Sequence, residues 1–355
     1  MIFRIPKAVI RNQRLSFGII LFISACLSVM LLIFSLNKFD ILSAKFFGDH
    51  KKILQYALTV TELGATGFSN TGLLYQKLGL ADSVTSVVIF SFIVCLGSFT
   101  YLLFKAPVVD FSTFTILFLF LAFSSVFLQM YSKDFFVLFI IMFMVIFGLK
   151  TKLGFALFVV FGLLYAFYFR SYWFLIFLVY FGFVITFSFF KISATRFKVL
   201  LFSCAFILIL SLAFELVLNV NLSHYRTIIN VSRIGAEAST SLIMPFIPLG
   251  NFFLEWINGL ITLLMLVFPL PLLALGGYQH IASFIAIGFI SVTFFRDMKF
   301  VMSDYGGKHA VFFVMSFVLI QMTFEPDYGS FLRHLTPILP LVATVHYKAL
   351  ILRYK

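Results

Sequence analysis

Apolar runs that are long enough to cross a lipid bilayer constrain this sequence more than any other feature. The run from Ser16 to Leu36 follows Arg11 and Arg14, and it matches the ~20 residues that a spanning helix needs. Of the 355 residues 62% are hydrophobic and 11% are charged, whereas soluble domains carry about 25% charged residues. A water-soluble core cannot bury this much apolar surface. The sequence therefore predicts an all-α, polytopic transmembrane helix bundle.

Ten membrane spans are predicted, and the whole chain 1–355 is expected to form a single integral membrane domain. Two long segments, 37–85 and 219–255, are expected to face outward. The predicted spans are 16–36, 86–104, 112–131, 135–149, 154–169, 172–190, 199–218, 280–295, 309–324 and 334–351.

The stretch 256–277 is apolar enough to be a further span, so it either crosses the membrane or dips in and returns. Pro269 and Pro271 stand at its centre. Because proline removes a backbone donor and breaks a helix, they favour a re-entrant segment. With that choice the basic clusters lie beside the cytoplasmic ends of the spans, and both termini are predicted to be cytoplasmic.

The net charge of +13 needs no nucleic acid to explain it. Basic residues gather next to apolar runs, which is the pattern of cytoplasmic loops in membrane proteins. The partner indicated by this pattern is membrane lipid. The sequence has no phosphate-binding glycine loop, no HExxH motif, no GxSxG motif and no acidic cluster of the DxD type, and its six histidines are scattered. No metal site and no cofactor are therefore predicted.

The second outward segment contains HYRTIINVSRIGAEAS, in which Arg226, Asn230, Arg233 and Glu237 recur at helical spacing. On a helix these residues form one polar face. Two arginines on one face suit a phosphate or pyrophosphate, because guanidinium groups bind oxyanions through two donors. The alternative is a solvated helix face with an Arg233–Glu237 pair, which contributes only a few tenths of a kcal/mol.

The segment FEPDYGSFLRH joins the last two predicted spans and is dense in polar groups. Glu325, Asp327 and His334 are candidates for catalytic acid–base work, and Tyr328 and Arg333 for binding substrate. The alternative is an ordinary polar turn in which Asp327 helps the chain to reverse.

A further candidate is Arg170, in the turn YFRSYWF between two predicted spans. It is the only charged residue of that outward turn, so it is a candidate for substrate binding. The alternative is interfacial anchoring beside its aromatic neighbours, which is common at membrane boundaries.

In layout the chain resembles bacterial surface-polysaccharide polymerases of the O-antigen and capsule type. The shared features are about ten spans, a Phe-rich composition and one large outward loop, late in the sequence, that carries the paired Arg226 and Arg233. The resemblance implies a metal-independent glycosyltransferase of the bacterial inner membrane. Such an enzyme joins polyprenyl-pyrophosphate-linked oligosaccharide repeat units at the outer face of that membrane. It also implies that Arg226 and Arg233 match the family's outward-loop arginines, and it makes a chain-length regulator protein a candidate partner.

Transport without chemistry is the competing class, in the form of a lipid-linked oligosaccharide flippase or another secondary transporter. Transporters usually place polar groups at the middle of the bilayer and often contain two similar halves. The sequence shows almost no charge at the centre of its spans and no repeat. These features favour the enzyme. An acyltransferase is less favoured, because no histidine-based catalytic motif is present.

Overall fold

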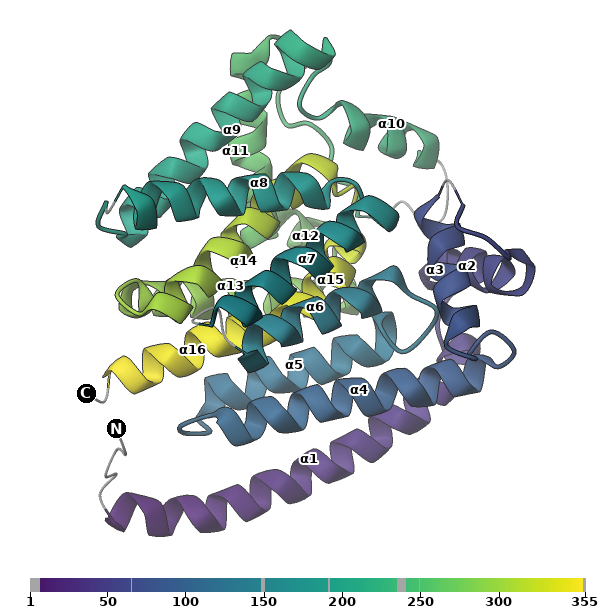
Figure 1. Ribbon diagram of the computed structural model, residues 1–355, viewed down its shortest axis with the longest axis vertical. Coiled ribbons are helices and arrows are strands. Elements are labelled where there is room, and N and C mark those ends of the chain that lie inside the picture. The colour runs from purple at the N-terminus through teal and green to yellow at the C-terminus, as the bar shows by residue number, and fades with distance from the viewer. Residues whose placement is uncertain are drawn as a thin grey trace.

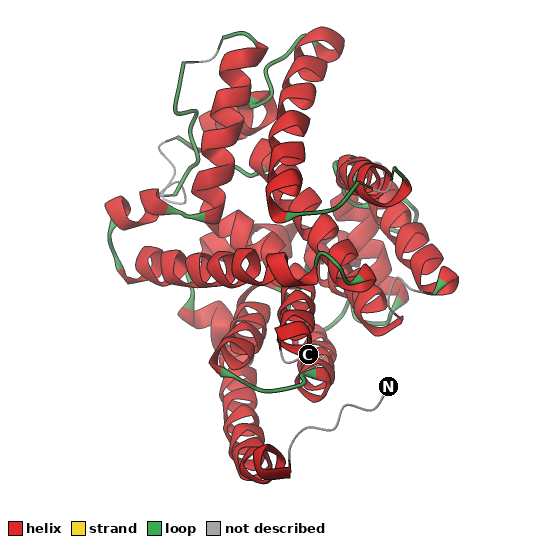
Figure 2. Cartoon of the chain, turned by 90° about the vertical axis from the view of Figure 1, so that its left-hand side faces the viewer, coloured by secondary structure: helices red, strands yellow, loops and turns green. Residues whose placement is uncertain are grey.

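The described part of the chain is built from helices. A computed structural model describes residues 7–64, 66–147, 151–190, 192–234, 241–248 and 250–353, and these residues contain no strand (Figures 1 and 2). The helices are α1 (Lys7–Ile41), η1 (Ala44–Phe47), α2 (Gly48–Thr59), α3 (Gly67–Lys77), α4 (Val84–Lys105), α5 (Phe111–Phe127), α6 (Lys133–Phe147), α7 (Lys152–Tyr168), α8 (Trp173–Val184), η2 (Ile185–Phe189), α9 (Arg196–Leu218), α10 (His224–Arg233), α11 (Phe252–Val267), α12 (Leu270–Leu275), α13 (Tyr278–Val301), α14 (Tyr305–Phe324), α15 (Tyr328–Leu335), η3 (Thr336–Ile338) and α16 (Leu339–Arg353).

Short polar residues set where many of these helices begin. Asp110, Thr195, Asn251, Asp304 and Asp327 each accept a hydrogen bond from a backbone N–H of the following first turn. Such a cap satisfies a donor that has no partner within the helix. The caps lie between apolar runs, so the sequence marks the points at which the chain reverses.

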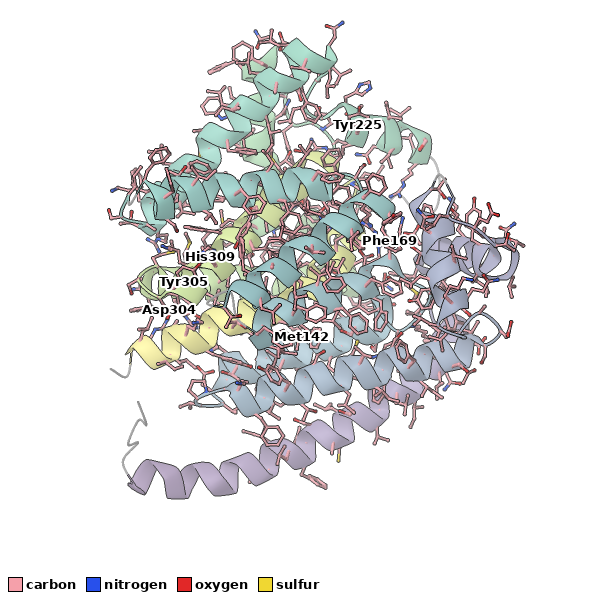
Figure 3. The ribbon with its side chains drawn as sticks, in the orientation of Figure 1. Met142, Phe169, Tyr225, Asp304, Tyr305 and His309 are labelled. Atoms are coloured by element: carbon pink, nitrogen blue, oxygen red, sulfur yellow. The ribbon has the colours of Figure 1, made fainter. Side chains whose placement is uncertain are left out.

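The long helices run back and forth between two faces of the bundle. The start of α1 and the end of α16 lie on the left of Figure 1, whereas α2, α3 and α10 lie on the right, and α15, near the middle of this view, is tied to α2 by its Arg333. We call these the terminal face and the loop face. Figure 2 looks onto the terminal face. In Figure 3 the side chains of Asp304, Tyr305 and His309 lie toward the terminal face, and Phe169 lies at the loop-face end of α7.

Within the part of the chain that the structure describes, six helical segments are long and apolar enough to cross a membrane. They are 18–41, 84–105, 196–218, 278–301, 305–324 and 328–353. Each of the ten predicted spans overlaps at least one described helix, but the span 112–131 runs past the end of α5 at Phe127, and residues 148–149 lie outside the described residues. Helices α5, α6, α7 and α8 are too short to meet the length required of a span, so the predicted number of ten is not confirmed.

The chain from the start of α11 to the start of α13 begins and ends near the loop face. Near the start of α11, Glu255 accepts hydrogen bonds from Ser223, which precedes α10. Leu272 of α12 and His280 of α13 then line one cavity with Arg233 at the end of α10. Helix α13 continues to the terminal face, where its Asp297 pairs with Arg353.

The segments 37–85 and 219–255, which are predicted to face outward, contain helices of their own. Within the first, Ile53 and Ala57 lie on α2, and both residues are fully buried in a cluster that includes Tyr75 of α3. Within the second, α10 is followed by a short extended stretch. There the Ile243 N–H donates to the Pro326 carbonyl at 2.8 Å, which ties this segment to the loop before α15.

Candidate functional site

A buried network of charged side chains lies at the loop face, and we call it the loop-face network. It joins residues that are far apart in the sequence, from α2, α6, the turn between α7 and α8, the end of α14, and α15. Its members are Asp49, Asp134, Arg170, Glu325, Arg333 and His334.

Arg170 stands at the centre of the network. Its Nη2 donates to Asp134 Oδ2 at 3.2 Å, and its Nη1 donates to the Tyr172 hydroxyl at 2.7 Å and also bonds to His334 Nε2. A guanidinium only donates, so His334 Nε2 is the acceptor and the imidazole proton lies on Nδ1. That nitrogen bonds to Glu325 Oε1. The histidine therefore links a carboxyl group to an arginine in a fixed tautomer.

Arg333 extends the network toward α2. Its Nη1 lies 3.0 Å from Asp49 Oδ2, and its Nε lies 3.5 Å from Asp134 Oδ2. Asp134 thus faces two arginines, and the side chains of Asp134 and Arg170 are only 5% and 8% exposed. Charges this deeply buried persist because they are paired.

Burial shapes the protonation of this network. It raises the pKa of Glu325 to about 8, so this carboxyl group is protonated at neutral pH. Burial also works against the charge of Arg170, but Asp134, Tyr172 and Tyr165 together outweigh it and raise the pKa of Arg170 well above its usual value. Glu325 Oε2 and Arg170 Nε are buried and have no hydrogen-bond partner within the described chain. The network therefore retains unused bonding capacity.

A cavity of about 400 Å³ adjoins the network. Its polar walls include Lys52, Arg233, Asp327, Tyr328 and Arg333, together with Asp49 and the first turn of α13. Asp327 caps α15 through its Oδ1 and pairs with Arg233 through its Oδ2, at an N–O distance of 2.6 Å. The cavity and the loop-face network share Asp49 and Arg333.

The predicted site residues divide into three groups. Asp327, Tyr328, Arg233 and Arg333 line the cavity. Three more, Glu325, His334 and Arg170, belong to the loop-face network but do not line the cavity.

Arg226 forms the third group. It is 1% exposed, and its Nη1 donates to the Met322 carbonyl at 2.8 Å and to the Thr262 hydroxyl at 3.2 Å. Burial lowers the pKa of Arg226 to about 10, so it stays charged at neutral pH. The polar face predicted on this helix is present, but Arg226 turns into the protein and Arg233 into the cavity. Glu237, the fourth residue of that face, lies outside the described residues.

Sequence reasoning missed Asp49, Asp134 and Lys52. Asp134 follows Lys133 at the start of an apolar run, which is where charged residues commonly mark a membrane boundary. Asp49 and Lys52 lie in the long first outward segment, and nothing in their spacing points to α15. No residue pattern within either segment could have indicated these contacts, because the partners lie in other segments: Asp134 pairs with Arg170, 36 residues along the chain, and Asp49 pairs with Arg333.

Among the residues that the structure describes, no group of His, Cys, Asp and Glu is arranged to hold a metal ion. Comparisons with models of known protein families, with curated proteins and with solved structures found no match. The arrangement defines a membrane protein of several apolar helices with a charged network and a basic cavity at one face. The chemistry of that site must be argued from its own residues.

Proposed function

We propose that this chain is a polymerase that joins polyprenyl-pyrophosphate-linked oligosaccharide repeat units into a surface polysaccharide. The observation that carries the proposal is the loop-face cavity, where Lys52, Arg233 and Arg333 converge with the carboxylate of Asp327. The three cations match a pyrophosphate leaving group. A carboxylate beside them suits the removal of a proton from a sugar hydroxyl.

The proposed topology has ten crossings, with α11 and α12 entering the membrane and returning to the same side. Helices α5, α6, α7 and α8 are too short to cross by length alone, and we propose that they complete the bundle where the membrane is locally thin. Both termini then face the cytoplasm, and the loop face lies at the outer surface of a bacterial inner membrane. The basic residues near the terminal face agree with this orientation.

The proposed reaction is a glycosyl transfer without a metal ion. The oxygen of an acceptor hydroxyl attacks the anomeric carbon of the donor glycan, and its proton passes to Asp327. The bond between that carbon and the pyrophosphate oxygen breaks, and the polyprenyl pyrophosphate leaves with the electron pair. Lys52, Arg233 and Arg333 stabilise the charge that develops on the leaving oxygen. Electrostatic stabilisation of this kind takes the place that a divalent cation has in other glycosyltransferases.

Glu325, His334 and Arg170 act as positioning residues in this scheme. They do not line the cavity, but Arg170 and Arg333 share Asp134, so the network fixes the direction in which the Arg333 guanidinium points. Tyr328 lines the cavity beside Asp327 and offers a hydroxyl and an aromatic ring to a sugar. Arg226 supports the loop from within the protein.

The test is reconstitution of the purified full chain in vesicles with lipid-linked repeat units. The proposal expects a ladder of lengthened glycans together with release of polyprenyl pyrophosphate, and it expects neither product from an Asp327→Asn variant. Asp304→Asn at the terminal face is the matched control and should leave the ladder intact. Movement of the lipid-linked units across the membrane without any lengthening would assign the chain to the transporters instead.

A further inference from the structure

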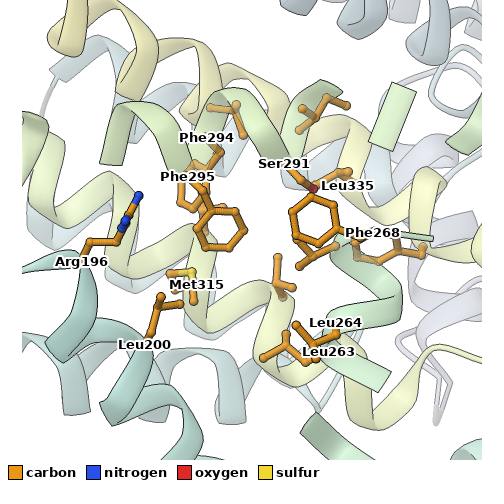
Figure 4. Close-up of a pocket in the computed structure, with 16 residues that line it drawn as sticks. Arg196, Leu200, Leu263, Leu264, Phe268, Ser291, Phe294, Phe295, Met315 and Leu335 are labelled. Atoms are coloured by element: carbon orange, nitrogen blue, oxygen red, sulfur yellow. The ribbon is translucent and has the colours of Figure 1, made fainter. Parts of the chain in front are cut away.

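An apolar groove runs along α9, α11, α13 and α14, away from the polar cavity. It has a volume of about 350 Å³, and aliphatic and aromatic side chains line it almost throughout (Figure 4). Its two polar residues are Arg196 and Ser291. The volume falls within the range of pockets that hold small ligands, and the lining suits a hydrocarbon chain.

The groove opens toward lipid. Leu264 and Phe268, which line it, are 58% and 41% exposed, although they lie in the apolar segment 252–268. Exposed apolar side chains in such a segment face the bilayer. A ligand therefore enters the groove sideways from the membrane, and a lipid is the molecule available there.

A positive charge stands at one end of the groove. Arg196 begins α9 at the terminal face, is exposed, and makes no ion pair within the part of the chain that the structure describes. In Figure 4 it lies at the end of the groove opposite Phe268, beside Phe294 and Phe295. The groove thus offers a chain-binding wall and a cation at the level of the lipid headgroups.

We propose that the groove binds an anionic phospholipid of the terminal-face leaflet, with its phosphate on Arg196 and an acyl chain between α11 and α13. The position of the charge decides between this occupant and the polyprenyl chain of a substrate. A substrate chain hangs from a pyrophosphate in the cavity at the loop face, so its polar end and Arg196 lie at opposite faces. The exclusion of a substrate chain rests on the proposed function, but the lipid site itself uses none of the cavity residues and can be tested separately.

Lys198 provides a matched control. It lies two residues from Arg196 on the same helix and is also exposed, but it bonds to the Ser193 hydroxyl at 2.9 Å and does not line the groove. A general preference of basic residues for the cytoplasmic surface treats the two side chains alike. A lipid bound in the groove would contact Arg196 but not Lys198.

The experiment uses the full chain in vesicles that contain a trace of phosphatidylglycerol with a photoreactive acyl chain, or phosphatidylcholine with the same chain. Peptides of α9, α11, α13 and α14 are then analysed for label. We expect about fivefold more groove label with phosphatidylglycerol, the effect of about one basic residue near an anionic lipid. Arg196→Ala should remove this preference and Lys198→Ala should retain it. Leu264→Trp should reduce groove label from both lipids, because the indole fills the groove without changing its charge.

Three outcomes overturn the inference. If both lipids label the groove equally, the groove does not recognise the charge of the headgroup. Equal effects of Arg196→Ala and Lys198→Ala show that Arg196 is only an interfacial charge. Loss of label on addition of undecaprenyl phosphate, with no effect of Arg196→Ala, assigns the groove to the chain of a polyprenyl substrate.

Discussion

Two clusters of buried charges lie at opposite faces of the bundle, and they differ in completeness. At the terminal face Asp297 is fully buried, faces Arg353, lies 3.0 Å from Arg296 Nε, and lies 2.5 Å from His346 Nδ1. His346 Nε2 lies 3.1 Å from Asp110 Oδ1, so both imidazole nitrogens have a carboxylate partner. We call these five residues the terminal-face cluster. The loop-face network also places a histidine between charged groups, but it adjoins a cavity, and within the described residues Glu325 Oε2 and Arg170 Nε have no hydrogen-bond partner.

The difference separates a structural cluster from a candidate site. In the terminal-face cluster the described carboxylates and cations satisfy one another and hold the ends of α5, α13 and α16 together. Neither the polar cavity nor the apolar groove is lined by any residue of this cluster. In the loop-face network some buried polar atoms have no hydrogen-bond partner among the described residues, and a cavity that could hold a ligand lies next to them. On the proposed function, similar residue types serve stability at one face and chemistry at the other.

The largest expected effect comes from the cavity carboxylate. Asp327→Asn keeps the side-chain oxygen that caps α15 but removes the proton acceptor. Polymer formation should fall about 10²- to 10⁴-fold, the usual contribution of a general base, while the apparent melting temperature changes little. The rate of chain lengthening in reconstituted vesicles is the measurement, and unchanged binding of the lipid-linked substrate is its control. If Asp327→Asn and the double variant Glu325→Gln/Asp327→Asn both lengthen chains at the wild-type rate, this loop is only a structural turn.

The second prediction applies the same change at the other face. Asp297→Asn leaves two arginines and His346 facing a neutral amide in a buried position. Breaking a buried ion pair typically costs about 3–5 kcal/mol, so the protein should be recovered in much lower amount or melt earlier in detergent. The protein that does fold should lengthen chains at the wild-type rate per folded molecule. A stable Asp297→Asn protein without activity would mean that the two clusters are coupled and would contradict the separation.

The third prediction distinguishes the two arginines of α10. Arg226→Ala removes a buried donor to the Met322 carbonyl and should destabilise the protein by about 1–3 kcal/mol. Arg233 is 42% exposed at its side chain, so Arg233→Ala should leave stability almost unchanged and weaken substrate binding. Arg233→Lys should rescue poorly, because an ammonium group cannot bind an oxyanion through two fixed donors. Thermal melting and the substrate concentration for half-maximal rate measure the two effects. The distinction fails if both alanine variants melt alike.

The smallest effect concerns pH. Because burial raises the pKa of Glu325 to about 8 from its ordinary value of 4.5, the folded protein holds a proton there that the unfolded chain releases. This contribution to stability is present in full below about pH 4.5 and is lost as pH rises toward 8. The apparent melting temperature of the wild type should therefore fall relative to that of Glu325→Gln between pH 5 and 8. Parallel curves for the two proteins would show that Glu325 is already ionised in the fold.

Much of the helical arrangement could be predicted from the sequence, because apolar runs of spanning length dictate helices in lipid. The coarse position of the site could also be predicted, since the polar loop after Phe324 stands between two long apolar segments. The residues that pair with Arg170 and Arg333 could not be predicted. Asp134 meets Arg170 only because α6 packs against α7, and Asp49 meets Arg333 only because α2 approaches α15, and helix packing leaves no periodic trace in the sequence. The helix face that carries Arg226 and Arg233 could be predicted. The sequence did not indicate that Arg226 would be buried while Arg233 lines the cavity.

The most direct test of the account is an experimental structure of the full chain with undecaprenyl pyrophosphate bound in a lipid nanodisc. The account predicts that the pyrophosphate lies in the loop-face cavity, within hydrogen-bonding distance of Arg233 and Arg333, and that its density is lost in an Arg233→Ala/Arg333→Ala variant. Pyrophosphate density at the terminal face, or anywhere away from this cavity while the cavity holds only water, would contradict the assignment of the loop face as the site of chemistry.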